Sequence, residues 1–235
     1  MSTPQGARAR ARMEVTTAIK DEARRQLAAE GAPKLSLRAV ARELGMVSSA
    51  LYRYFPSRDD LLTALIIDAY DSLGEAAETA HAAAASAADA APAHRWVAVC
   101  EAVRRWALTH PHEYALIYGS PVPGYSAPDT TIPPAARVAL VLVGILREAF
   151  EGRGLARTPV PAELAPEARR MADELVPGLP PEVAVAMAAA WAQLFGLVGF
   201  ELFGQFKGIV EEAERERFFR HAAAQLAHGV GLVFP

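Results

Sequence analysis

The sequence predicts an all-α protein, and three observations support this fold class. Apolar residues recur every three or four positions in several segments, as they do along one face of a helix. No segment alternates polar and apolar residues over the length of a strand. The composition of the 235 residues, 52% hydrophobic and 22% charged, provides enough apolar material for a core and excludes a disordered or fibrous chain. We therefore expect one large helical domain or two modest ones.

Two helices are predicted at the start of the chain. The first has apolar residues at four-residue spacing, namely Val15, Ile19, Ala23 and Leu27. It should end before Gly31, because glycine and the following proline interrupt the pattern. A short second helix is expected over residues 37–44, with Ser36 as its N-cap. Gly45 can adopt the left-handed conformation that ends this helix.

Two further helices follow at once. Ser48 is expected to cap a third short helix, which Phe55 and Pro56 close because proline disfavours the helical conformation of the residue before it. Residues 57–60, with the sequence Ser-Arg-Asp-Asp, have the pattern of a capping box. They should open a fourth helix whose apolar residues are Leu61, Leu62, Leu65 and Ile66. Leu51 and Phe55 are expected in the core.

The rest of the chain alternates between predicted helices and irregular segments. Residues 76–93 are dominated by alanine and predict a thinly packed helix with a break near Pro92. The Pro/Gly-rich segments 120–133 and 152–180 predict loops, the second with a turn or two of helix around 166–175. Further helices are expected over residues 95–109, 111–119, 134–151, 181–205 and 210–228.

Charge is distributed unevenly along the chain. Residues 1–58 have a net charge of +6, whereas residues 59–235 have a net charge of −9. A basic first quarter followed by an acidic remainder is typical of a polyanion-binding head joined to a separate module. Chance clustering on a solvated face is the alternative, and the charge pattern alone does not decide between them.

The segment 36–55, SLRAVARELGMVSSALYRYF, has the pattern of a helix-turn-helix. Ala41 is small enough for two helices to cross closely, and Gly45 lies at the tight turn four residues later. The longer order V-S-x-A-x-Y-x-Y-F-P-S-R-D-D-L-L, within residues 15–73, resembles the DNA-binding domain of the tetracycline-repressor (TetR) family. The family usually has histidine at the position of Tyr54 and lysine at that of Arg58, and both replacements can still contact phosphate.

The resemblance implies a homodimeric transcriptional regulator, usually a repressor, that binds palindromic double-stranded operator DNA. Residues 1–58 would form the helix-turn-helix DNA-binding domain, and residues 59–235 the ligand-binding and dimerisation domain. The expected DNA contacts are Ser36, Arg38, Ser48, Ser49, Ala50, Tyr52, Arg53, Tyr54 and Arg58. Arg53 is expected to bind a base, most plausibly guanine, and Ala50 to touch a thymine methyl group. The tyrosines, Ser36 and Arg58 are expected on phosphates, and a loose arm of Arg8, Arg10 and Arg12 on the DNA backbone.

The penultimate helix is apolar on nearly all sides, which predicts burial against its own bundle and the two-fold mate. Residues 183–200 also approach the length of a membrane span, a rival interpretation that we do not favour, and no other segment is a comparable candidate. We expect dimerisation through the last two helices and no membrane partner. A pocket for an apolar or aromatic effector of unknown identity is expected at Trp96, Cys100, Val103, Tyr114, Tyr118, Val141, Ile145, Trp191 and Phe195. For each of these residues, ordinary core packing is the alternative.

An enzyme is the hypothesis from another class, but the sequence has no GxxxxGK[ST], GxGxxG, HExxH or GxSxG motif. His110, His112 and Glu113 are a local cluster of metal-ligand types, although two histidines two positions apart do not easily bind one metal. We therefore expect neither a metal nor a cofactor. The single cysteine fits a reducing cytoplasm, and no signal peptide is expected. An architectural DNA-binding protein without ligand control remains an alternative.

Overall fold

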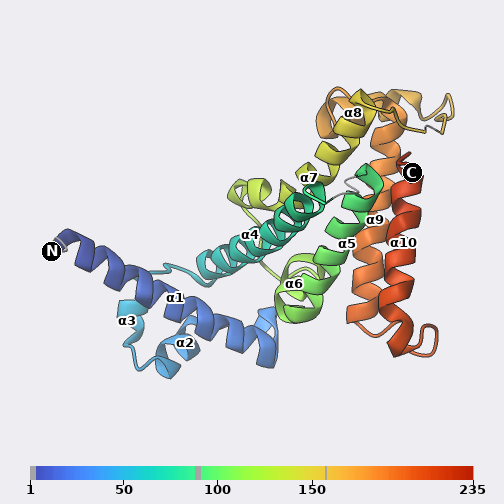
Figure 1. The fold of residues 1–235 in the computed structure, drawn as a ribbon. Coiled ribbons are helices and arrows are strands. Elements are labelled where there is room, and N and C mark those ends of the chain that lie inside the picture. Colours follow the sequence, from blue (N-terminus) through green and yellow to red (C-terminus); the bar gives the residue numbers. More distant parts are fainter. Residues whose placement is uncertain (1–3, 88–90, 157, 235) are drawn as a thin grey trace. The chain divides into compact units, whose positions relative to one another are not determined.

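The computed structural model describes residues 4–87, 91–156 and 158–234, and within these ranges the regular structure consists of α-helices and short 3-10 helices without a strand (Figure 1). The all-α prediction is therefore confirmed. Contacts divide the chain into two compact units. The head unit comprises residues up to Tyr70 together with 110–133, and the body unit comprises 71–109 together with the residues from Pro134 onward.

The head unit is built from α1 (Pro4–Glu30), α2 (Leu37–Glu43), α3 (Ser48–Leu51), the first turns of α4 (Arg58–Ala85) and α6 (Pro111–Tyr118). Its core is made of apolar side chains that include Ile19, Ala23, Leu27, Val40, Ala41, Leu51, Phe55, Leu61, Leu62 and Leu65. The predicted core positions Leu51 and Phe55 are thus confirmed. Ala41 is fully buried, as expected for a residue at a close crossing of two helices.

The predicted helix ends are mostly confirmed. The Ser36 hydroxyl accepts the Ala39 N–H at 3.4 Å and caps α2, and Gly45 ends the turn with a φ of +64°. The Ser57 hydroxyl accepts the Asp60 N–H at 3.1 Å, which is the first of the two hydrogen bonds of a capping box, and it donates to the Asp60 carboxylate at 2.7 Å. The third short helix is present as predicted, but its predicted N-cap was wrong, because Val47 rather than Ser48 is the N-cap residue, and the helix already ends at Leu51. Ser48 is instead the first helical residue.

The helix α1 differs most from the prediction. It begins at Pro4, so Arg8, Arg10 and Arg12 are helical rather than part of a loose arm. Residues 7–12 alternate alanine and arginine, which are both good helix formers. Extending an existing helix also avoids the cost of nucleating a new one. This segment lacks apolar periodicity, and for that reason the hydrophobic pattern did not reveal its helix.

The body unit contains the later turns of α4, α5 (Pro92–Thr109), most of α7 (Ile132–Glu151), α8 (Ala165–Leu175), α9 (Pro181–Leu202) and α10 (Arg215–Gly229). The helix α10 packs along α5 and α9, and α8 packs on α9 (Figure 1). The core of the unit includes Trp96, Leu142, Ile145, Leu146, Leu194, Val198 and Phe219.

Several boundaries in this part of the chain differ from the prediction. The helix α4 ends at Ala85, earlier than expected, and α7 begins two residues earlier than expected, with two prolines in its first turn, where proline is tolerated. Between α9 and α10 a longer turn contains Gly204 and Gly208, both with positive φ, so α9 ends at Leu202 and α10 begins only at Arg215. The residues 88–90 of the alanine-rich stretch lie outside the described part of the chain.

Among the residues that the structure describes, two helical segments are long and apolar enough to cross a membrane by length and composition alone. They are Asp129–Glu151 and Pro181–Leu202. Only the second was expected from the sequence, so the prediction that no other segment is comparable was wrong. About a third of the residues in each segment are buried inside the protein, and core helices of soluble proteins pass the same test.

Several arginines in the described part of the body unit connect helices, among them Arg95, Arg104 and Arg137. Arg104 forms two hydrogen bonds of 2.6 Å with the Glu201 carboxylate, joining α5 to α9. Arg95 joins α5 to Glu148 of α7 in the same bidentate way, at 2.6 and 2.7 Å. From α7, Arg137 reaches two carboxylates of α4, those of Asp71 at 2.9 Å and Glu78 at 2.7 Å.

Candidate nucleic-acid interface

The short helix α3 presents a polar face to solvent. Its one buried residue is Leu51, which fixes the helix to the head core. Ser48 and Ser49 in its first turn are exposed, and Ala50 is half-buried. Small side chains at the start of a helix allow the backbone to approach a DNA groove closely. The face of α3 that follows the α2–α3 turn therefore has the shape and the polarity of a recognition helix.

Arg53 and Tyr52 follow α3 and are both exposed. The Arg53 guanidinium has no hydrogen-bond or ion-pair partner within the described part of the chain, while its backbone carbonyl accepts a hydrogen bond from Arg12 Nη2 at 3.4 Å. Tyr54 differs from Tyr52, since its ring packs against the head core and lies under the Arg12 guanidinium at 5.2 Å. Both tyrosines are predicted to contact phosphates, and the structure distinguishes them, because Tyr52 is exposed whereas Tyr54 is half-buried.

The remaining predicted contacts lie at α2 and α4. Arg38 is exposed in the first turn of α2. Ser36 is half-buried, and its N–H donates to Gln26 Oε1 at 3.4 Å, so both its hydroxyl and its amide have partners inside the head. Arg58 donates to three backbone carbonyls of the 32–35 turn, those of Ala32 at 2.8 Å, Pro33 at 3.2 Å and Leu35 at 3.2 Å. Arg58 thus joins α4 to this turn, and its contact with phosphate stays a prediction.

The cations of the head divide into paired and unpaired groups. Lys20 and Arg24 both bind the carboxylate of Asp68, at 2.8 and 2.7 Å, and Arg25 binds Glu22. By contrast, the structure records no ion pair for the following cations within the described residues: Arg8, Arg10, Arg38 and Arg53. The unpaired guanidinium groups are the ones available to an external polyanion.

The nine residues predicted to form an effector pocket are divided between the two units, and the pocket stays a prediction. Trp96, Cys100, Val103 and Ile145 are fully buried in the body core. Val141, Trp191 and Phe195 are half-buried in the same unit, and the last two have ring centroids 4.6 Å apart. Tyr114 and Tyr118 belong to the head unit, with ring centroids 5.2 Å apart. Burial raises the pKa of both tyrosine hydroxyls and of the Cys100 thiol.

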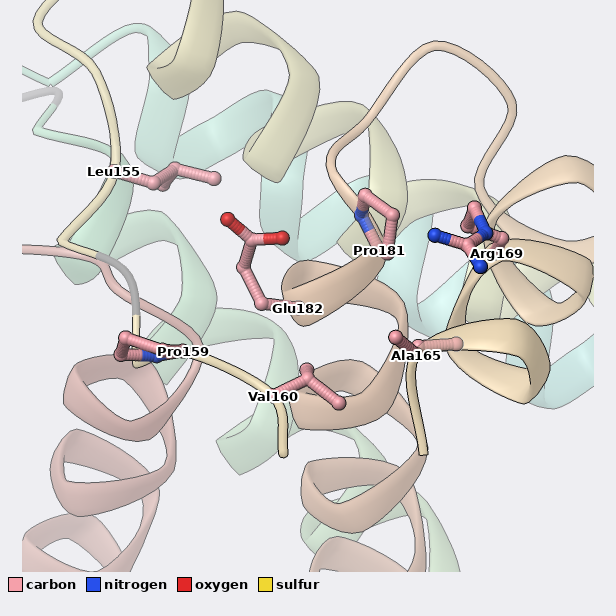
Figure 2. A pocket seen from close by; sticks show the side chains of 8 residues that line it. Leu155, Pro159, Val160, Ala165, Arg169, Pro181 and Glu182 are labelled. Atoms are coloured by element: carbon pink, nitrogen blue, oxygen red, sulfur yellow. The ribbon is translucent and has the colours of Figure 1, made fainter. Parts of the chain in front are cut away.

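Two large surface cavities lie within the described residues of the body unit, and none of the nine predicted residues lines either of them. One of about 640 Å³ lies between the loop after α7, α8 and the start of α9. Figure 2 shows Glu182 of α9 directing its carboxylate into this space, between Leu155 and Pro181. The other, of about 610 Å³, lies between α4 and α5 and has an alanine-rich floor with Glu75, Arg105 and Trp106 around it. Within the described residues no cluster of three or more metal-ligand side chains is present.

Comparisons with known proteins agree with this geometry. A family model described as bacterial regulatory proteins, tetR family, matches residues 19–65, and one described as a tetracyclin repressor-like C-terminal domain matches residues 96–226. The HTH-type transcriptional regulators Rv1816 of Mycobacterium tuberculosis and Mb1846 of Mycobacterium bovis are each 40% identical to the chain over 215 residues, which is 86% of this chain and 86% of each relative.

Solved structures show the same fold. The crystal structure of the protein SCO4313 is 35% identical in sequence, with a TM-score of 0.74, over 94% of this chain and 98% of that one. The TetR family transcriptional regulator PfmR of Thermus thermophilus is 20% identical, with a TM-score of 0.60, over 90% of this chain and 97% of that one.

Proposed function

The chain belongs to the tetracycline-repressor family of DNA-binding transcriptional regulators, and from this premise we propose that it is a repressor controlled by a small ligand. In this proposal a homodimer binds a palindromic operator through its two helix-turn-helix heads. A small apolar or aromatic molecule then binds the body and releases the protein from DNA. The observation that carries the DNA-binding part is the exposed face of α3, with an unpaired Arg53 at its end and Leu51 anchoring it from behind.

Arg53 is proposed to bind a guanine edge. Arginine can donate two hydrogen bonds to the O6 and N7 atoms of guanine, and such a pair typically contributes about 1–3 kcal/mol of discrimination. The remaining predicted contacts, at Arg38, Ser48, Ser49 and Tyr52, surround it on the exposed side of α2 and α3. These side chains would fix the register on DNA through phosphates, while Arg53 provides sequence preference.

The first experiment is selection of random duplex DNA by the purified protein, followed by sequencing of the enriched molecules. An inverted repeat with half-sites about 10 base pairs apart, or a multiple of that spacing, is the expected result for a two-fold symmetric dimer. A folded protein that enriches no sequence at low salt would refute operator binding. Enrichment without sequence preference would favour an architectural DNA-binding protein instead.

Fluorescence anisotropy on the selected operator then tests the role of Arg53. The Arg53→Ala variant should bind at least about fivefold more weakly and lose preference at one base position in each half-site. The matched control is Arg170→Ala, which removes the same charge from the exposed helix α8 of the body. Circular dichroism of both variants should equal that of the wild type. Unchanged operator affinity in Arg53→Ala would contradict the assigned role.

The proposed dimer uses α9 and α10. On α9, the exposed side has small residues at helical spacing, Ala189, Ala192 and Gly196, followed by the exposed ring of Phe200. A Cβ added to Gly196 meets no atom within 4 Å in the single chain. A large side chain there is therefore harmless unless another chain covers this face. We expect Gly196→Arg to shift the dimer to monomer in sedimentation velocity, and an intact dimer of this variant would exclude this face as the interface.

Ligand control is tested with the operator complex. A two-state mechanism requires that the ligand bind one spacing of the recognition helices better than the other. Ligand would then stabilise a dimer whose recognition helices no longer match the roughly 34–36 Å repeat of the groove. A panel of planar aromatic and acyl compounds should include one that releases operator at a concentration near its own dissociation constant. If no compound in the panel releases the protein from operator DNA in a saturable way, ligand control is refuted. The proposal that the protein binds DNA is not affected by that result.

A further inference from the structure

The first turns of α1 extend beyond the part of this helix that packs in the head. Ile19 is the first fully buried residue of α1, whereas residues 6–14 are all exposed. At 1.5 Å per residue, the eight helical residues from Pro4 to Ala11 cover about 12 Å. The exposed residues 6–11 of this segment include Arg8 and Arg10, which have no recorded partner within the described residues. Packing of the head does not explain why these turns are basic.

Helical geometry places the arginines on different sides of α1. With 100° between successive residues, Arg8 and Arg12 lie about 40° apart, and the core residue Ile19 lies between them in projection. Arg10 is about 180° away from Ile19. On that outer side it lies along a surface groove with two carboxylates, those of Glu14 and Asp21. The helix thus separates the arginines into a pair that continues the core-facing side and one that faces outward.

Arg12 places the core-facing side of these turns beside the residues that follow α3. Its guanidinium donates to the Arg53 carbonyl at 3.4 Å and lies over the Tyr54 ring at 5.2 Å. Arg53 and Tyr54 immediately follow the recognition helix α3. Arg8, one turn further toward the N-terminus on the same side, therefore extends the basic surface outward from the end of the recognition helix. The basic surface of the helix-turn-helix is continuous with this side of α1.

We propose that the first turns of α1 are a second DNA-contacting element, in which Arg8 and Arg12 bind backbone phosphates beside the segment that α3 contacts while Arg10 faces away from DNA. The proposal rests on the proposed function, because it requires that α3 bind a duplex. Phosphates are the expected partners, since a guanidinium forms paired hydrogen bonds with phosphate oxygens. A folded helix also holds both groups in place before binding, so less conformational freedom is lost than with a loose arm.

The experiment compares Arg8→Ala with Arg10→Ala on the selected operator, by anisotropy over a range of salt concentrations. Both variants remove one positive charge from the same exposed helix, and alanine keeps the helix propensity high. Each phosphate contact contributes about 0.9 to the slope of log K against log salt. Arg8→Ala should therefore reduce the magnitude of the slope by about 1.8 for a dimer, equally on operator and on unrelated duplex. Arg10→Ala should leave the slope unchanged.

A second measurement uses operator duplexes with shortened flanks. If Arg8 binds phosphates at the edge of the half-site, removing those base pairs should weaken the wild type to the level of Arg8→Ala and leave the variant unaffected. Equal losses in Arg8→Ala and Arg10→Ala would overturn the proposal and indicate a loose arm or a general field effect. No change of slope in either variant would also overturn it. Failure of the wild type to select any operator would instead refute the proposed function.

Discussion

Removing one partner of the ion pair between Arg104 and Glu201 is expected to destabilise the body strongly, in contrast to the same change in a surface pair. Both carboxylate oxygens of Glu201 accept hydrogen bonds of 2.6 Å from Arg104, and the two side chains are only 6% and 16% exposed. Arg104 also lies over the Phe219 ring of α10 at 5.5 Å. One guanidinium therefore joins α5, α9 and α10.

The perturbation is Glu201→Gln, which keeps the shape but removes the charge and one of the two hydrogen bonds. Removing one partner of a buried ion pair typically costs about 3–5 kcal/mol, because the other charge stays buried without compensation. Hydrogen bonding to Glu201 raises the pKa of Arg104, and the more distant Glu216 and Glu101 add to this effect. Since these two carboxylates partly compensate the charge that remains, we expect the lower end of that range, about 3 kcal/mol.

Urea and thermal unfolding, followed by circular dichroism at a fixed protein concentration, measure the effect. For a chain of this size a loss of about 3 kcal/mol lowers the melting temperature by roughly 6–12 °C. The matched control is Glu167→Gln on α8, where Arg170 holds the carboxylate in the same bidentate way but both side chains are about half exposed to solvent. That variant should melt with the wild type.

A double variant distinguishes the uncompensated charge from a general disruption of packing at this site. Arg104→Met combined with Glu201→Leu replaces both charges with apolar side chains of similar volume, and such replacements are often neutral. It should therefore recover most of the stability that Glu201→Gln loses. Equal melting temperatures for Glu201→Gln and Glu167→Gln would refute the reasoning, because burial would then make no difference to the pair.

Three further predictions follow from other sites in the body. Gly74→Ala should lower the free energy of unfolding in urea by about 1–3 kcal/mol, because the new Cβ would lie 2.7 Å from the side chain of Arg137. Gly144→Ala places its Cβ where no atom lies within 4 Å, and it should raise the free energy of unfolding by up to about 1 kcal/mol. The hydrogen-bonded guanidinium of Arg95 lowers the pKa of Glu148 below its ordinary 4.5. The stability from this pair is therefore complete above about pH 4.5 and is lost as the pH falls through the lower pKa of the folded state. Glu148→Gln should reduce the loss of stability in acid, and an unchanged dependence of stability on pH would contradict this. Cys100 is fully buried and its thiol pKa is raised, so an aromatic disulfide reagent should label it only after unfolding, and rapid labelling of the native protein would argue against the core assignment.

The sequence predicted the helix-turn-helix well because its signals are local. Ser36, Gly45 and the Ser57–Asp60 box each act within a few residues, through a cap, a left-handed turn or a reciprocal pair of hydrogen bonds. The periodic apolar residues around them then identified the core of the head. Where the local pattern was weaker the boundaries moved, as at the long turn between α9 and α10.

Roles that depend on distant partners were not predictable in this way. The hydrogen bonds of Arg58 reach carbonyls of a turn more than twenty residues earlier, and nothing near Arg58 in the sequence indicates that turn as its partner. Tyr52 and Tyr54 are two residues apart and similar in character, yet only Tyr54 has Arg12 over its ring. Tyr114 belongs to a different unit from most residues of the predicted pocket, a division that depends on tertiary contacts.

The structure shows which of the basic residues in the first quarter of the chain are available to bind DNA, and the net charge alone does not. The net charge of +6 treats all lysines and arginines alike, but those of the middle of α1 already have carboxylate partners in the head. Counterions leave the DNA when protein cations neutralise its phosphates, and the cations available for this are those without a carboxylate partner in the protein. Arg8, Arg10, Arg38 and Arg53 meet this condition. Of these, Arg8, Arg38 and Arg53 lie on the side of the head that is proposed to face DNA, whereas Arg10 lies on the outer side of α1. A salt dependence of binding therefore reports on this small set of arginines, and a dimer that contacts six phosphates through them should lose roughly a thousandfold in affinity between about 50 and 200 mM salt.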